Sequence, residues 1–354
     1  MVKKEFIGQM HLCNRYGEKQ SGELKLDAID KKILYFLRVN ARFSNSFIAS
    51  QLNLKRETVS YRVRRMEELN FIQGYSTVID PTRIGLKNHI ILIKLKSFKF
   101  EKDILNYLVT LKEVTRLHNC SGSFDIQVSC TTKHDEEFNQ FFNTLINQFH
   151  DAISNYEILS VIKEGFMEPT FFIDKDTINR LNLLERKGSS FQKDINLQPT
   201  HSLLGLISLT NEDKQILREL RLNARISITE LSAKTGLVPA TVDSKIKKLI
   251  QSGVIKSFYA IPAFSMLGYQ WYRLFFRVKN LEEKRFLTFL KFKSNASWFM
   301  STIGKWNYLV AIFAKDNVEF YKILDEIRTE FTDNILNYDS IIIFNRFKDV
   351  QRIE

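Results

Sequence analysis

The stretch NARFSNSFIASQLNLKRETVSYRVRRMEELNFIQGY, residues 40–75, returns 183 residues later as NARISITELSAKTGLVPATVDSKIKKLIQSGVIKSF, residues 223–258. The two copies align without a gap over residues 26–85 and 209–268. A solenoid would need several short repeats stacked on one another, whereas in this sequence one long unit occurs twice. We therefore interpret the chain as a duplicated domain.

Apolar residues recur at helical spacing in three successive runs of each copy. In the first copy the third run places Val59, Val63 and Met66 on one face. Asn53 and Gly236 precede this run in the two copies, at a turn position that tolerates a positive φ. Three helices with a tight turn between the second and third predict a helix-turn-helix, and the short strand-like segments that follow predict a wing.

The outward side of the third helix carries mostly positive charge in both copies. A helix in the major groove needs cations along its flanks for phosphates and short polar side chains near its tip for base edges. We therefore predict double-stranded DNA as the partner, against the alternative of a small helical bundle with a solvated basic face. The candidate DNA-binding residues are Lys55, Arg56, Thr58, Ser60, Tyr61, Arg62, Arg64, Arg65, Thr241, Ser244, Lys245, Lys247 and Lys248.

The composition is typical of a globular protein that binds a polyanion. The net charge of +12 and the pI near 9.4 favour nucleic acid or an acidic surface as partner. Three cysteines make no disulfide framework and fit a reducing compartment. The sequence has no apolar run that could span a bilayer and no apolar core typical of a signal peptide near Met1. We expect a cytoplasmic protein that makes no membrane contact.

The strings LDAIDKKIL, residues 26–34, and ETVSYRVRRMEELNFIQGYSTVIDPTRIGL, residues 57–86, are similar to the N-terminal half of the Lrp/AsnC transcription regulators. The resemblance returns more loosely over residues 209–269. It implies a regulator in which each helix-turn-helix is followed by a βαββαβ ferredoxin-like domain that mediates oligomerisation and binds small effectors, often amino acids. The alternation of strand and helix patterns after each copy agrees with that order.

We therefore predict an α+β protein in which two winged helix-turn-helix domains alternate with two ferredoxin-like domains. Four of the five prolines lie at the proposed junctions. The predicted units are an N-terminal tail (1–25), winged helix-turn-helix 1 (26–80), ferredoxin-like domain 1 (81–168), a linker (169–207), winged helix-turn-helix 2 (208–262) and ferredoxin-like domain 2 (263–354).

The family resemblance also implies a Gly-x-x-Asp motif at the hairpin of the ferredoxin-like domain, close to bound effectors. The first copy has it as Gly122 and Asp125, whereas the second has Gly304 and Asn307. A carboxylate could accept a hydrogen bond from the ammonium group of an amino acid. Glycine and aspartate are also common in tight turns, so plain turn chemistry is the alternative. We predict Gly122 and Asp125 as effector-binding residues and leave the second site open.

Duplication predicts a family-like dimer built inside one chain, with further homo-oligomerisation left open. The tips of the two third helices differ, because the first begins with Lys55 and Arg56 and the second with Val238 and Pro239. Since base contacts discriminate by donor and acceptor pattern, unlike tips predict unlike half-sites. The alternative is a second copy that has become chiefly structural.

An enzyme is the main alternative function, because siroheme decarboxylases use the same architecture. The pairs His11-x-Cys13 and His118-x-Cys120 are isolated, and two ligands rarely make a tetrahedral metal site. The sequence also has no glycine-rich phosphate loop and no nucleophile elbow. We therefore predict no catalytic residue, no metal and no cofactor. A small-molecule sensor that does not bind DNA is the third possibility.

Overall fold

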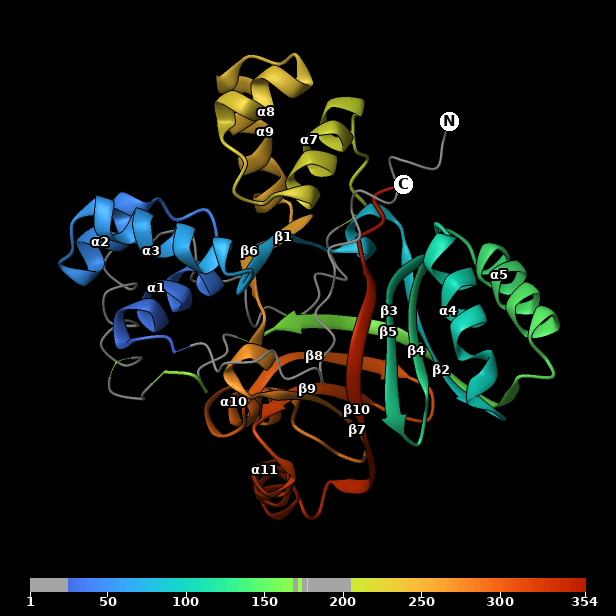
Figure 1. The fold of residues 1–354 in the computed structure, drawn as a ribbon. Coiled ribbons are helices and arrows are strands. Elements are labelled where there is room, and N and C mark those ends of the chain that lie inside the picture. Colours follow the sequence, from blue (N-terminus) through green and yellow to red (C-terminus); the bar gives the residue numbers. More distant parts are fainter. Residues whose placement is uncertain (1–24, 168–170, 174–176, 178–204) are drawn as a thin grey trace.

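The computed structural model describes residues 25–167, 171–173, 177 and 205–354 (Figure 1). All but the last residue of the predicted N-terminal tail and most of the predicted linker therefore lie outside the described residues. Within the described part, the alternation of helix-turn-helix units and βαββαβ segments is as predicted, and the fold class is α+β. No described helix is both long enough and apolar enough to cross a membrane.

The first helix-turn-helix unit is fixed by side-chain caps at its helix starts. Asp27 accepts hydrogen bonds from the backbone of Ile29 and Asp30, and Asp30 bonds back to Asp27, which completes a capping box. Ser44 caps the second helix, and Asn53 ends it in the left-handed region at a φ of 53°. The elements are α1 (Ala28–Val39), α2 (Asn45–Leu52), α3 (Arg56–Glu68) and β1 (Ile72–Ile79).

The second unit repeats these devices with different residues. Thr210 and Asp213 form its capping box, Ser227 caps the second helix, and Gly236 ends that helix at a φ of 72°. Pro239 is the first residue of the third helix, where a missing amide hydrogen is harmless. The elements are α7 (Asn211–Leu222), α8 (Ile228–Thr235), α9 (Pro239–Gln251) and β6 (Ile255–Pro262).

The two wing segments pair with each other. Strand β1 runs antiparallel to β6, with Ser76 opposite Tyr259 and Thr77 opposite Phe258. Each copy therefore supplies one strand of a shared two-stranded sheet, and the two helix-turn-helix units lie on either side of it (Figure 1). The sequence predicted a wing in each copy, but the two strands belong to different copies, and local pattern gives no signal of their pairing.

Each βαββαβ segment forms a four-stranded antiparallel sheet with two helices. The strand orders are β5-β2-β4-β3 and β10-β7-β9-β8, which is the ferredoxin-like order in both copies. The elements are β2 (Lys87–Leu95), α4 (Glu101–Thr110), β3 (Val114–Gly122), β4 (Ile126–Thr132), α5 (Asp135–Gln148) and β5 (Ile153–Phe166), then β7 (Gln270–Val278), α10 (Glu283–Lys293), β8 (Ala296–Ile303), β9 (Tyr308–Ala314), α11 (Asn317–Glu330) and β10 (Ile335–Asp349).

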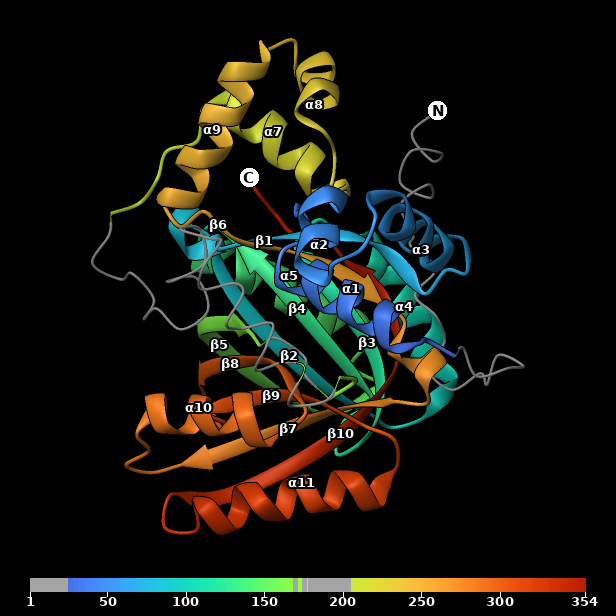
Figure 2. The same cartoon turned by 90° about the vertical axis from the view of Figure 1, so that its left-hand side faces the viewer.

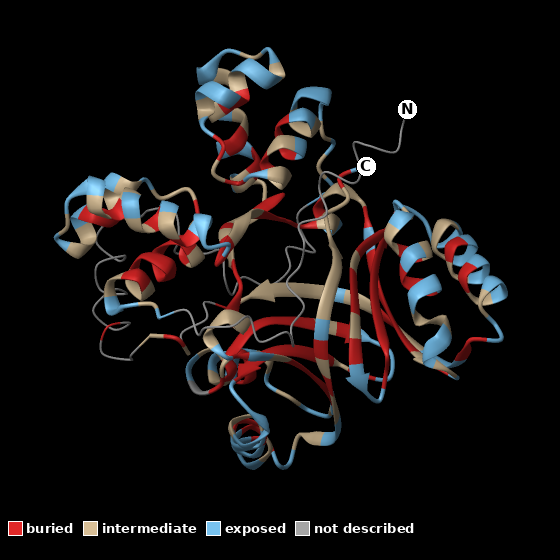
Figure 3. Cartoon of the chain, viewed as in Figure 1, coloured by how far each residue is buried: buried red, intermediate tan, exposed pale blue. Residues whose placement is uncertain are grey.

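The two sheets join at both edges. Strand β5 pairs with β8 and strand β10 pairs with β3, so that the eight strands close into a ring. The helices cover the outside of this ring, with α4 and α5 on one sheet (Figure 1) and α10 and α11 on the other (Figure 2). A separate apolar cluster fills the space between the sheets and includes Leu92, Leu159, Phe275 and Met300. Burial is therefore concentrated in the strands and on the inner faces of the helices (Figure 3).

Candidate functional site

Helix α3 presents one group of the predicted DNA-binding side chains to solvent. Lys55, Arg56 and Arg64 are exposed, and none of them forms an ion pair with a carboxylate in the part of the chain that the structure describes. Tyr61 has 60% of its surface exposed, and Thr58 is half-buried near the start of the helix. These side chains are free to contact a phosphate backbone or base edges.

A second group on the same helix is held inside the domain. Arg62 donates to Asp27 at 2.6 Å and to Asp30 at 2.8 Å, and Arg65 lies 3.5 Å from Asp30. The hydrogen bonds to Asp27 and Asp30 raise the pKa of Arg62. Ser60 accepts a hydrogen bond from a side chain of α2 at 3.0 Å. The geometry therefore gives Arg62 a structural role, because it fastens α3 to the start of α1.

Lysines of helix α9 also form ion pairs within their own domain. Lys245, which corresponds to the clamping arginine of α3, pairs with Glu212 at 2.8 Å and Asp213 at 3.0 Å. Lys247 pairs with Asp243 at 2.7 Å on the helix surface. The free cations of α9 are thus reduced by ion pairing within the domain.

The remaining predicted DNA-binding side chains of α9 are two hydroxyl groups and one lysine. Lys248 is exposed and forms no ion pair with a described residue, Ser244 is exposed, and Thr241 is half-buried. Where α3 and its N-cap Lys55 together have three exposed, unpaired cations, α9 has one within the described structure. The two helices therefore differ in charge as well as in the identity of their tips.

Two arginines of the repeated Asn-Ala-Arg string link the copies. Arg42 of the first copy donates to the backbone oxygens of Ala224 at 2.8 Å and Ile226 at 3.1 Å. Arg225 of the second copy donates in return to the backbone oxygen of Ala41 at 3.0 Å. The sequence shows both arginines at matching positions, but it gives no sign of their reciprocal role, because only the fold brings the two copies together.

The predicted effector motif is used for structure in both copies. Asp125 is buried, accepts a hydrogen bond from the backbone of Leu95 at 2.8 Å and pairs with Lys94 at 3.0 Å. Asn307 accepts the corresponding backbone bond from β7, also at 2.8 Å. The change from carboxylate to amide therefore preserves this strand contact.

The glycines of the motif stand where the two sheets meet. Gly122 has a φ of 128°, and a Cβ there would come within 2.7 Å of the backbone oxygen of Ser340. A Cβ on Gly304 would come within 2.7 Å of the Leu159 side chain. Both glycines allow close approach of strands from different copies. Effector binding by Gly122 and Asp125 stays a prediction.

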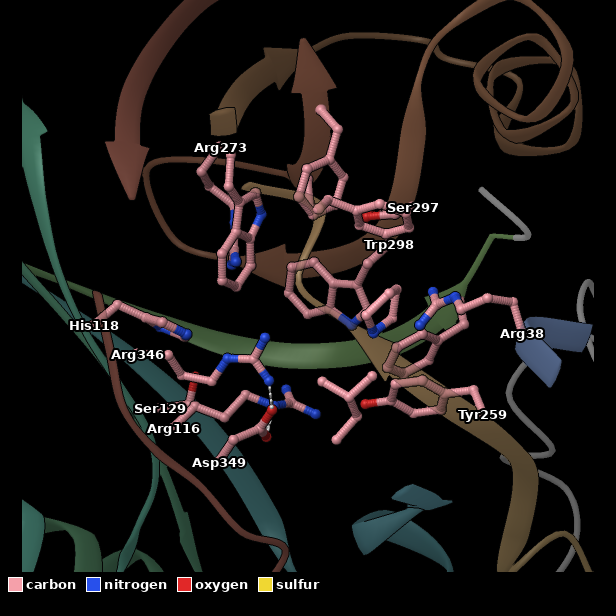
Figure 4. A pocket seen from close by; sticks show the side chains of 17 residues that line it. Arg38, Arg116, His118, Ser129, Tyr259, Arg273, Ser297, Trp298, Arg346 and Asp349 are labelled. Carbon is pink, nitrogen blue, oxygen red and sulfur yellow. Dashed lines mark hydrogen bonds and ion pairs between the residues drawn. The ribbon is translucent and has the colours of Figure 1, made fainter. Parts of the chain in front are cut away.

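The structure contains a cavity that the sequence did not predict, which we call the arginine pocket (Figure 4). It has a volume of about 90 Å³ and lies where α1 and β6 meet the strand ring. Its lining comes from both copies and from both kinds of domain. The charged and polar side chains that line it are Arg38, Arg116, His118, Ser129, Tyr259, Arg273, Ser297, Arg346 and Asp349.

Two cations of the arginine pocket are matched by carboxylates. Arg116 donates to Glu164 at 2.6 Å and lies 3.5 Å from Asp349, while Arg346 pairs with Asp349 at 2.7 Å. Burial alone would lower the pKa of Arg116, but Glu164 and Asp349 raise it. Glu164 also accepts from the indole nitrogen of Trp298 at 3.0 Å. This network holds the walls of the pocket in place.

Arg273 is different, because it is buried with no carboxylate at ion-pair distance among the described residues, although Glu164 is close enough to raise its pKa. It is 3% exposed and forms no ion pair with any described residue. Its guanidinium lies 5.3 Å from the ring centre of Trp271 and 4.5 Å from that of Trp298. Burial, with the nearby charge of Arg116, lowers the pKa of Arg273 to about 9, so it stays protonated at neutral pH.

His118 lies beside these arginines and is neutral at ordinary pH. It is buried, and desolvation together with the charges of Arg273, Arg346 and Arg116 lowers its pKa well below the usual value. Its Nδ1 atom has no hydrogen-bond partner in the described structure. The described residues contain no cluster of three or more potential metal ligands.

Both helix-turn-helix units match models of known protein families. A model of the AsnC-type helix-turn-helix domain matches residues 26–67, and a model of winged helix-turn-helix DNA-binding domains matches residues 212–256.

Several regulators are similar to one repeated unit in length. The HTH-type transcriptional regulator LrpB of Bacillus subtilis is 26% identical over 141 residues, which are 40% of this chain and 91% of the relative. An uncharacterized HTH-type transcriptional regulator of Pyrococcus abyssi is 30% identical over 147 residues, 41% of this chain and 99% of the relative. Ptr1 of Methanocaldococcus jannaschii is 35% identical over 117 residues, 33% of this chain and 78% of the relative.

One solved structure matches nearly the whole chain. The siroheme decarboxylase NirDL covers 91% of this chain and 93% of its own, with a TM-score of 0.60 and 12% sequence identity. The same enzyme in complex with an iron-uroporphyrin III analogue gives a TM-score of 0.58. At this identity the likeness establishes a shared tandem fold.

Proposed function

We propose that this chain, which belongs to the Lrp/AsnC-type helix-turn-helix family, binds double-stranded DNA through α3 and α9 and regulates transcription. The observation that carries the proposal is the set of exposed, unpaired cations Lys55, Arg56 and Arg64 on α3. Cations that are not consumed within the protein can replace the counterions of a phosphate backbone. The net charge of +12 acts in the same direction at long range.

The contacts between the two copies support a protein that binds DNA with two helix-turn-helix units at once. The shared sheet of β1 and β6 and the reciprocal bonds of Arg42 and Arg225 hold both helix-turn-helix units in one chain. In regulators that assemble from two chains, a two-fold axis relates equal recognition helices. Here the helices are unlike, so we propose that the chain reads two unlike half-sites.

The experiment is a salt series of binding to random-sequence duplex DNA. We expect that changing Lys55, Arg56 and Arg64 together to Ala weakens binding and flattens the salt slope by about 0.9 for each phosphate that the variant no longer neutralises. The paired residues Arg62 and Lys245 are left intact, because their removal would disturb the domain itself.

A matched control removes the same net charge elsewhere. Lys102, Lys284 and Lys322 are exposed on helices of the ferredoxin-like domains, and changing all three to Ala removes three charges away from α3. Equal weakening by both triple variants would mean that only overall charge matters, and would contradict a recognition surface on α3.

The arginine pocket favours a second candidate function, decarboxylation of a tetrapyrrole. The activity for which NirDL is named, together with a buried histidine beside several arginines in this chain, motivates it. The cavity of about 90 Å³ is smaller than the roughly 150 Å³ that holds benzene in a protein interior, so a tetrapyrrole would require the pocket to open. An unchanged visible spectrum after iron-uroporphyrin III is added to the protein would remove this candidate.

A further inference from the structure

The arginine pocket has an electrostatic imbalance centred on Arg273. Its neighbours Arg116 and Arg346 are matched by Glu164 and Asp349, but Arg273 has no described carboxylate within ion-pair distance. A buried charge without a partner is strongly unfavourable for folding. Such a residue is tolerated where a ligand of opposite charge can complete the pair.

The side chains in contact with the Arg273 guanidinium include two aromatic rings. The faces of Trp271 and Trp298 lie on its guanidinium, and Phe166, Phe264 and Phe313 add further apolar lining beside the charged and polar groups named above. Inorganic anions are strongly hydrated and gain little from such walls, whereas an organic anion buries its carbon body against them. The cavity of about 90 Å³ encloses only a few heavy atoms, fewer than the benzene ring that a cavity of roughly 150 Å³ holds. An aromatic carboxylate would therefore keep part of its ring outside the enclosed volume.

The pocket also touches the DNA-binding layer. Arg38 belongs to α1, and its Nη1 donates to the backbone oxygen of Ala260 in β6 at 2.9 Å. Its guanidinium lies 4.9 Å from the ring centre of Tyr259, and both residues line the cavity (Figure 4). An occupant would therefore contact the helix-turn-helix layer on one side and β7 on the other.

We propose that the arginine pocket is an effector site for a small organic carboxylate, which pairs with Arg273 and packs against Trp271 and Trp298. Because the ligand bridges the strand ring and α1, its binding changes the affinity of the chain for DNA. The site is separate from the Gly122 and Asp125 hairpin. The regulatory half of this inference rests on the proposed DNA-binding function.

The first test is a fluorescence titration of the full chain, since Trp271 and Trp298 are two of its three tryptophans. We expect saturable changes with benzoate, and at least about tenfold weaker binding of benzamide, which has the same shape without the charge. Acetate should bind more weakly than benzoate because it lacks the apolar body. No saturable change with benzoate, or equal binding of inorganic phosphate, would overturn the assignment.

A pair of variants on one strand separates the site from general effects. Arg273→Met should abolish the benzoate response, whereas Arg277→Met, at an exposed position of β7, should keep it. Without ligand, the melting temperature of Arg273→Met should equal or exceed that of the wild type, because an unpaired buried charge has been removed. A clear drop, with Arg277→Met unaffected, would show that Arg273 is needed for packing and would overturn its role as a ligand-binding charge.

The last arm measures DNA binding with and without saturating benzoate. We expect the midpoint to shift by about fivefold or more in wild type and Arg277→Met, and not in Arg273→Met. Benzoate binding without any shift would overturn the regulatory half alone. Absence of DNA binding under every condition would instead overturn the proposed function, while the fluorescence titration still decides whether the pocket takes a carboxylate.

Discussion

The internal repeat gives the chain two cavities at corresponding places, and they differ sharply. The arginine pocket has a volume of about 90 Å³, and its counterpart about 20 Å³. Three aligned positions account for much of the contrast. The arginine pocket has Trp271, Trp298 and Phe313 where the counterpart has Asn88, Arg116 and Thr131.

The counterpart cavity is also filled from within the chain. Gln351 accepts a hydrogen bond from the backbone of Ile79 at 2.6 Å, and Arg352 donates to the backbone oxygen of Thr131 at 2.7 Å. Arg352 further pairs with Glu137 at 2.8 Å. The arginines of the counterpart are thus paired with carboxylates, whereas the arginine pocket keeps one arginine without an ion pair among the described residues. The two copies of this cavity have therefore diverged in volume and in lining.

The largest expected effect comes from breaking the network that holds the arginine pocket. Removing one partner of a buried ion pair costs about 3–5 kcal/mol. Because Asp349 remains near Arg116, we expect Glu164→Gln to lower the free energy of unfolding by about 3 kcal/mol, measured by urea unfolding followed by circular dichroism.

The exposed pair of Arg285 and Glu330 provides the control for this change. Its side chains are 55% and 41% exposed, so Glu330→Gln should cost less than about 1 kcal/mol. Similar losses for the two variants would mean that the pocket network contributes no more than a surface ion pair, and the contrast between the two cavities would lose its energetic basis.

A smaller effect should appear as a dependence on pH. Folding lowers the pKa of His118, so below its unfolded value of about 6.5 the unfolded chain binds the extra proton and stability falls as the pH falls. One pH unit below the unfolded value, this loss cannot exceed about 1.4 kcal/mol for this residue. His118→Met, which installs the residue of the second copy at the aligned position Met300, should remove that part of the acid loss in melting curves between about pH 7.5 and 5.5.

His89 should still contribute to the loss of stability in acid in the His118→Met variant, because burial also lowers the pKa of His89. The acid sensitivity should therefore decrease and not vanish. An unchanged pH dependence in His118→Met would contradict a neutral, buried His118 beside the arginines.

The architecture could be predicted from the sequence because its signals are local or repeated. Helical spacing, the residues at positive φ such as Asn53 and Gly236, and the two aligned copies all lie within short windows. The pairing of β1 with β6 and the closure of the strand ring could not be predicted in this way. They join segments that are far apart in the chain, and only the fold brings them together.

The arginine pocket could not be predicted either, because its residues are far apart in the chain. Arg116, Arg273 and Arg346 come from three strands and from both copies, so no motif unites them. One signal was present: Arg273 interrupts an apolar strand at a position where the first copy has Ile90. Among the predicted DNA-binding residues, the structure separates exposed cations such as Arg64 from Arg62, which pairs inside the domain.

One chain carries two unlike helices, α3 and α9, and we propose that they read DNA together. The decisive experiment selects bound fragments from random duplex DNA with the purified chain and sequences them. We predict an enriched site made of two different half-sites, because the tips of α3 and α9 differ in charge and in side chains. A symmetric palindrome, or no enrichment at all, would contradict this account.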